Sequence, residues 1–177
     1  ASCTATLFSG PRDDVDVAAT TADCLAQPLE LPPLSVAIVP GDSVVIAVER
    51  NAPVLDDVIA ALWSMLAAAG VAAKDVAILQ PADVAATEHL DPRRKLPPDV
   101  AAQVAWKTHD PTAHDACGYL ASSASGERIY LSRVLLDADL VIPVSLAGFD
   151  SLMGYKSPCS MLYPGMSNPE AFKKTHS

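Results

Sequence analysis

The fold is decided by the stretch Val44-Val45-Ile46-Ala47-Val48 and the segment that follows it, through to Val76-Ala77-Ile78-Leu79. Both apolar runs are typical of strands buried on two faces, as in a parallel sheet that helices cover. Between them, apolar side chains keep the spacing of one buried helical stripe, at Leu55, Val58, Ile59, Leu62, Leu66 and Ala69. A strand, a long helix and a second strand predict a right-handed parallel crossover.

Signals for both ends of this helix are present. Asn51 or Ala52 is expected near the N-cap, with Pro53 in the first turn. Asp56 and Asp57 follow where the helix dipole favours negative charge, and Gly70 ends the helix.

The remaining pattern is looser but consistent with the same class. It predicts a short helix end at 100–104, a strand at 105–109, a hairpin around Ser125-Gly126, a helical turn at 133–137, a strand at 140–144 broken by Pro143, and a helix from Ser167-Asn168-Pro169-Glu170 to about Lys174. We therefore expect an α/β fold: a mainly parallel sheet with helices on both faces, a Rossmann-like layered domain with a small β-hairpin insertion.

The first part of the chain is expected to differ from the rest. Pro28, Pro32 and Pro33 punctuate residues 1–33, which we interpret as an irregular lead-in. Residues 34–177 would form one α/β domain. The sequence has no initiator Met, and we expect it to be a fragment of a two-domain protein.

Composition excludes several classes of protein. Of 177 residues, half are apolar, which argues against disorder, and the net charge of −9 disfavours nucleic acid as a partner. The longest apolar run, 58–73, is short for a membrane span, and no signal peptide is visible. The four cysteines form no C-x-x-C pair, so we read them as reduced thiols and expect a cytoplasmic location.

Ligands of such sheets bind beyond the carboxyl ends of the strands. Four loops fall there, at 49–51, 80–83, 108–114 and 145–165, and either line one cleft or are ordinary polar turns. Two local patterns within them are weak. His109, His114 and Cys117 are residue types that bind zinc but match no common zinc spacing, and an unrelated zinc protein that uses them is a third option. The glycine-rich segment 148–165 offers backbone N–H groups to a phosphate but contains no P-loop.

Several blocks from about Cys24 to His176 together resemble the N-terminal domain of the nickel-pincer lactate racemases. The matching blocks are Leu25-Ala26-Gln27-Pro28 with Leu31-Pro32-Pro33-Leu34, the strand at 45–48 followed by Asn51-Ala52-Pro53-Val54, His109-Asp110, the hairpin, Arg133, Asp137 to Ile142, Pro164-Gly165 and His176. In that family a nickel pincer nucleotide sits between two domains and is tethered by a lysine. Histidines ligate the nickel and move protons, and an arginine binds the carboxylate of a 2-hydroxy acid.

The resemblance places most of these roles on other residue types in this chain. The substrate arginine falls on Ala52, one catalytic histidine near Val84 and the other on Asp150, and the tethering lysine on Ser160. The nickel-ligand histidine is kept as His176. A gapped alignment puts Lys156 at the tether position instead.

Two hypotheses of function follow from the resemblance. The first is a divergent racemase-like isomerase or epimerase of a small 2-hydroxy acid that uses a nickel pincer nucleotide. His176 would ligate the metal, Asp150 would act as a base, and Lys156, Cys159 and Ser160 would lie at the cofactor. The alternative is a non-catalytic binding or regulatory paralogue that keeps the scaffold. In both cases the C-terminal domain of the same protein is the expected partner.

Overall fold

A four-stranded parallel sheet forms the centre of the computed structural model, which describes residues 15–50, 52–82, 90–150 and 154–175. The strand order is β3-β2-β1-β6. The register pairs Val44 of β1 with Val76 of β2 on one side and with Leu140 of β6 on the other. The bounds are β1 Val44–Val48, β2 Val76–Gln80, β3 Ala105–Thr108 and β6 Leu140–Val144.

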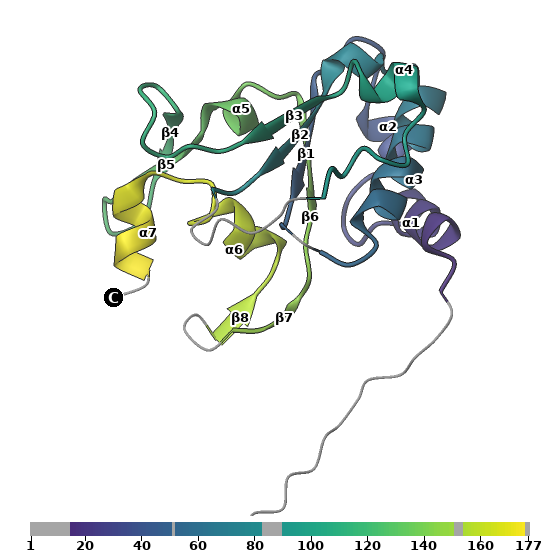
Figure 1. Ribbon diagram of the computed structural model, residues 1–177. Helices are drawn as coiled ribbons and strands as arrows, with labels where there is room; N and C mark the ends of the chain where they lie inside the picture. The colour runs from purple at the N-terminus through teal and green to yellow at the C-terminus, as the bar shows by residue number, and fades with distance from the viewer. Residues whose placement is uncertain (1–14, 51, 83–89, 151–153, 176–177) are drawn as a thin grey trace, which may run out of the picture.

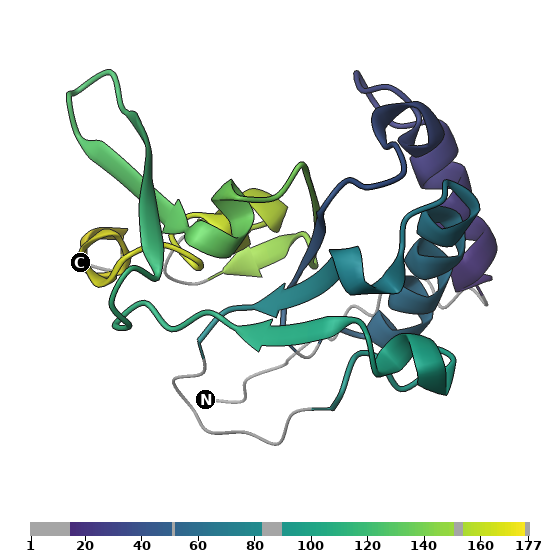
Figure 2. The ribbon, with the colours of Figure 1, turned by 90° about the horizontal axis from the view of Figure 1, so that it is seen from above.

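Helices cover both faces of this sheet (Figures 1 and 2). One face carries α1 (Val17–Ala26), α2 (Leu34–Ala37), α3 (Leu55–Ala68) and α4 (Pro98–Ala101), and the other carries α5 (Arg133–Leu136) and α6 (Pro158–Leu162). A 3₁₀ turn, Ala73–Asp75, leads into β2. The predicted α/β class with helices on both faces is therefore confirmed.

The alternation of side chains along β1 supplies both halves of the core, because successive residues of a strand point to opposite faces. Ile46 packs with Ile59, Leu62 and Leu66 of α3, whereas Val45 and Ala47 belong to the cluster of Leu135, Met161 and Met166. All five residues of β1 are buried, as its continuous apolar pattern predicted.

Smaller elements lie outside the central sheet. The hairpin of β4 (Cys117–Ser122) and β5 (Arg128–Ser132) forms at the predicted Ser125-Gly126 turn, and α7 (Pro169–Thr175) lies beside it in both ribbon views. A second pair, β7 (Gly148–Asp150) and β8 (Gly154–Lys156), follows β6. No helix in the described ranges has the length and apolar character needed to cross a bilayer.

Three local predictions were wrong. Residues 17–26 of the lead-in, which we predicted to be irregular, form α1. Asp16 caps this helix by accepting from the Ala19 N–H at 3.0 Å, and Pro28, Pro32 and Pro33 lie beyond its end. The cap of α3 is Val54, in a left-handed conformation (φ 50°), so Pro53 precedes the helix. Asn51 lies outside the described residues.

The third correction concerns Pro143, which does not break its strand. The Val144 carbonyl accepts from the Glu49 N–H at 2.9 Å, so the backbone groups of Val144 face β1. Because neighbouring residues of a strand face opposite sides, the nitrogen of Pro143 faces away from β1. This is the outer side of the sheet, where a missing N–H costs no ladder bond.

Candidate functional site

The loops that follow β1 and β6 are joined by one carboxylate at the carboxyl edge of the sheet. Glu49, the residue after β1, accepts from Lys156 Nζ at 2.6 Å and from the Leu146 N–H at 2.8 Å. Its side chain is 23% exposed and that of Lys156 is 39% exposed. A partly desolvated charged pair therefore fixes the β8 strand against the end of β1.

Similar bridges connect the other two strand ends. Arg50 donates from Nη2 to the Pro81 carbonyl at 2.7 Å, linking the loops after β1 and β2. The Gln80 amide donates to Thr108 Oγ1 at 2.9 Å, linking β2 to β3. The four predicted loops thus share one edge, as the parallel register requires. Among the described residues, one cavity borders the loop after β1 and another borders the loop after β3.

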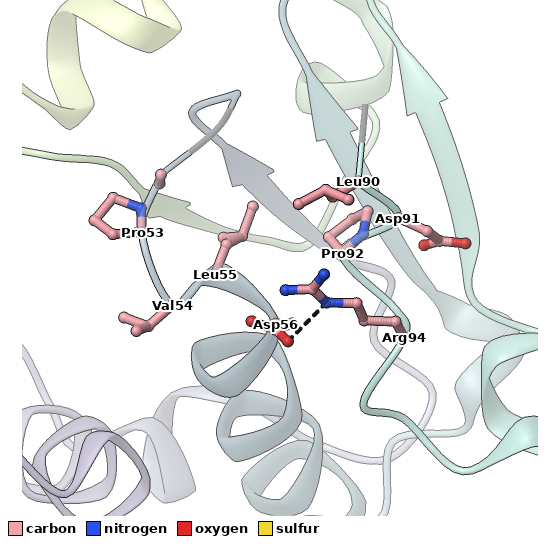
Figure 3. A pocket seen from close by; sticks show the side chains of 9 residues that line it. Pro53, Val54, Leu55, Asp56, Leu90, Asp91, Pro92 and Arg94 are labelled. Atoms are coloured by element: carbon pink, nitrogen blue, oxygen red, sulfur yellow. Dashed lines mark hydrogen bonds and ion pairs between the residues drawn. The ribbon is translucent and has the colours of Figure 1, made fainter. Parts of the chain in front are cut away.

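The first cavity lies between the start of α3 and the segment that leads to α4 (Figure 3). Its volume is about 250 Å³, and it is lined by Ala52, Pro53, Val54, Leu55, Asp56, Leu90, Asp91, Pro92 and Arg94. Ala52 is the position to which the resemblance assigns the substrate arginine. Its N–H donates to the Glu49 carbonyl at 3.3 Å, so this cavity adjoins the Glu49–Lys156 pair along the chain.

Asp56 is the buried charge of this cavity, with 6% of its surface exposed. Arg94 Nε donates to its carboxylate at 2.8 Å, and Lys95 Nζ lies 3.3 Å from the same oxygen. The Arg94 hydrogen bond, supported by Lys95, holds the pKa of the Asp56 carboxyl below its usual range despite burial. Asp56 is therefore ionised at neutral pH and holds Arg94 at the cavity.

The second cavity surrounds His109, which is 4% exposed. Its Nε2 lies 2.9 Å from the Ser167 carbonyl, and Cys117 Sγ lies 3.9 Å from the same nitrogen. Burial raises the pKa of the Cys117 thiol. His114, by contrast, has 94% of its side chain exposed and pairs with Asp115, so the zinc interpretation of these residues has no geometric support.

The residues predicted for the cofactor lie in β8 and α6, in different environments. The Ser160 hydroxyl accepts from the Ser157 N–H at 2.8 Å as one half of a capping box at the start of α6, and it also donates to the Ser157 carbonyl at 2.9 Å. Cys159 is an exposed free thiol. Lys156 is held by Glu49, as described above. Their proposed roles remain predictions.

Other predicted positions are less defined. Asp150 pairs with Gly154 through the backbone of β7, but its side chain is not among those described. Val84 and His176 lie outside the described residues. In the described part of the chain no group of three or more metal-binding side chains comes together.

Sequence reasoning missed the Asp56–Arg94 pair. Asp56 and Asp57 were interpreted only through the helix dipole, and the basic run Arg93-Arg94-Lys95 was not used. The available signal was the match between an acidic pair at a helix start and a basic triplet before the next helix. Complementary charge in these two segments does not by itself determine which acidic residue pairs with which basic residue.

Comparisons with known proteins agree with this architecture. The family model described as lactate racemase N-terminal domain matches residues 6–177. The lactate racemase apoprotein from Thermoanaerobacterium thermosaccharolyticum has a similar fold, with a TM-score of 0.66 at 15% identity over 88% of this chain. The chain spans 38% of the length of that protein. No curated protein matches the chain. By the family model, which covers nearly all of its length, this chain belongs to the lactate racemase N-terminal domain family.

Proposed function

We propose that this chain is the N-terminal domain of a racemase-like isomerase or epimerase that acts on a small 2-hydroxy acid with a nickel pincer nucleotide. The observation that supports this most is the Glu49–Lys156 pair, which holds a primary amine at the carboxyl edge of the parallel sheet. This is the edge at which ligands bind in such folds. When bound, the nucleotide would supply hydride chemistry that side chains lack.

The residues of this chain fit the nickel pincer nucleotide only in the gapped alignment, which puts Lys156 at the tether position. A serine hydroxyl cannot replace a lysine amine in an amide-type tether, and both polar functions of Ser160 already serve the α6 cap. Lys156 provides an amine four residues earlier, with 39% of its side chain exposed. We therefore assign the tether to Lys156 and the nickel ligand to His176.

Asp150 is the proposed base, because it stands at the position of a catalytic histidine in the resemblance. A carboxylate acts as a base near neutral pH only when its pKa is raised, for example by burial against the second domain. An Asp150→Ala variant with unchanged turnover would remove this role.

The test uses the complete protein, co-expressed with the enzymes that make the cofactor. We expect bound nickel by metal analysis and an added mass by intact mass spectrometry. Lys156→Ala should lose the added mass, whereas Cys159→Ala, a change at an exposed neighbour in α6, should keep it. The proposal would be contradicted if the unmodified protein contained no nickel and showed no added mass.

A second candidate is a non-catalytic binding or regulatory paralogue. It is favoured by Ala52, which cannot hold a carboxylate, and by the use of Ser160 as a cap. This candidate predicts that the protein binds a hydroxy acid or the nucleotide without interconverting the enantiomers. Chiral chromatography of lactate incubated with the loaded protein separates the two functions.

The partner we propose is a C-terminal domain of the same protein. The chain covers only 38% of the lactate racemase apoprotein, so a relative of that length would have further chain beyond this domain. We also propose a cytoplasmic protein with no nucleic-acid partner, since the net charge of −9 repels phosphate backbones.

A further inference from the structure

The cavity at the start of α3 combines apolar walls with one guanidinium. Val54, Leu55 and Leu90 supply aliphatic surface, and Arg94 is the cationic residue that lines it (Figure 3). Its volume of about 250 Å³ lies below the range of about 300–1,000 Å³ found for drug-sized ligands. Its dimensions therefore suit a small molecule with one anionic end and one apolar end.

The guanidinium of Arg94 retains donors for such a ligand. Only Nε is used by Asp56 among the contacts of the described residues, and an arginine carries five N–H donors. The Arg94 side chain is 51% exposed, and in Figure 3 its guanidinium lies between the first turn of α3 and the Leu90–Pro92 segment. Asp56 thus orients the group while leaving both terminal nitrogens for an anion.

The acidic groups of this cavity are already neutralised. Asp91 accepts from Arg93 at 2.8 Å and 3.0 Å, so its charge is paired outside the Arg94 contact. Asp56 is shared between Arg94 and Lys95, which adds a second positive charge against one buried carboxylate. An incoming carboxylate therefore meets a guanidinium beside acidic groups whose charges are already paired with cations.

We propose that this cavity binds the carboxylate of a small aliphatic 2-hydroxy acid, with Arg94 pairing with the carboxylate and Val54, Leu55 and Leu90 contacting the alkyl group. Planar guanidinium and carboxylate groups match in a two-bond geometry that a lysine cannot provide. The hydroxy-acid identity rests on the proposed function, whereas the anion site rests on the cavity alone. Aliphatic walls favour a branched alkyl group over a methyl group.

The experiment is calorimetric titration of the complete apoprotein, without nickel or nucleotide. The probes are sodium lactate, sodium 2-hydroxyisovalerate and the uncharged lactamide. We expect millimolar binding of both acids, tighter for 2-hydroxyisovalerate, and at least about tenfold weaker binding of lactamide.

Arg94→Gln should weaken binding of the acids by about tenfold or more, since it removes a charge-assisted contact. Arg94→Lys should give an intermediate loss. The matched control is Lys95→Gln, which removes an adjacent charge from the same carboxylate but does not line the cavity, and should change affinity less than about twofold. Circular dichroism of each variant checks that the fold is retained.

Three results would overturn the proposal: no binding of either acid, equal binding of lactamide, or equal losses for Arg94→Gln and Lys95→Gln in folded protein. Because no cofactor is present, these outcomes are independent of the nickel and mass test. Anion binding without nickel loading would leave this site standing and contradict the isomerase. Nickel loading without anion binding would support the isomerase and contradict the anion site.

Discussion

Replacing Asp56 by asparagine removes a buried charge without changing the shape of the side chain. The carboxylate is 6% exposed and contacts Arg94 at 2.8 Å and Lys95 at 3.3 Å. A hydrogen bond to a charged group contributes about 1.5–3 kcal/mol, and an acid in the first helical turn about 0.3–1 kcal/mol. The side chains of Arg94 and Lys95 are about half exposed, and solvent screening therefore lowers the contribution of the charged hydrogen bond toward its minimum.

We therefore expect Asp56→Asn to lower the free energy of unfolding by about 1.5–2.5 kcal/mol at pH 7. For a chain of this length, this corresponds to a fall of about 3–10 °C in Tm. Urea unfolding followed by circular dichroism measures the first quantity, and thermal melts measure the second. Asp57→Asn is the matched control. Its side chain is 37% exposed and pairs with Lys95, so the expected loss is about 0.5 kcal/mol.

The same reasoning predicts the pH dependence. The pKa of Asp56 is lowered in the folded chain, chiefly by the hydrogen bond from Arg94. Its stabilising contribution is therefore complete above the unfolded pKa of about 4 and is lost as pH falls through the lower folded value. The difference between the parent and Asp56→Asn should shrink below pH 4. Equal costs for Asp56→Asn and Asp57→Asn, or a difference that stays constant into acid, would refute the reasoning.

Three further predictions concern the core and the second cavity. Leu66→Ala removes a fully buried side chain of α3 and should cost about 2.7–5 kcal/mol in urea unfolding; a cost below 1 kcal/mol would contradict the packing described. His109→Phe keeps volume but leaves the Ser167 carbonyl unpaired, which should cost about 1–3 kcal/mol by the same measurement. The raised pKa of Cys117 keeps it a thiol at pH 7, so iodoacetamide should modify exposed Cys24 much faster, as peptide mass spectrometry would show; equal rates would argue against burial of Cys117.

The central unit was predictable because its signals are local. The β-branched run of β1 and the helical stripe that continues to Leu66 each fix an element from neighbouring residues alone. Loop closure and handedness then leave one arrangement of strand, helix and strand. The cap of α3 was missed because Val54, a β-branched residue, rarely adopts a left-handed conformation, so no sequence rule points to it.

The site was predictable only as a region. Parallel pairing brings the four loops to one edge, and this follows from the strand pattern. The contacts within that region do not, because Glu49 and Lys156 are 107 residues apart and Asp56 and Arg94 are 38 apart. Ser160 illustrates the opposite case. Its cap at α6 was readable from Ser157-Pro158 and the hydroxyl three residues after Ser157, yet the resemblance directed attention to the cofactor instead.

Pro143 also affects how the molecule meets copies of itself. Strand β6 closes one side of the sheet, and its outward backbone groups offer a template on which a foreign strand can add. The proline removes an amide from the middle of that template, so an added strand would lack one rung of its ladder. A missing rung disfavours such addition, which a wholly β-branched strand at that position would permit along its full length.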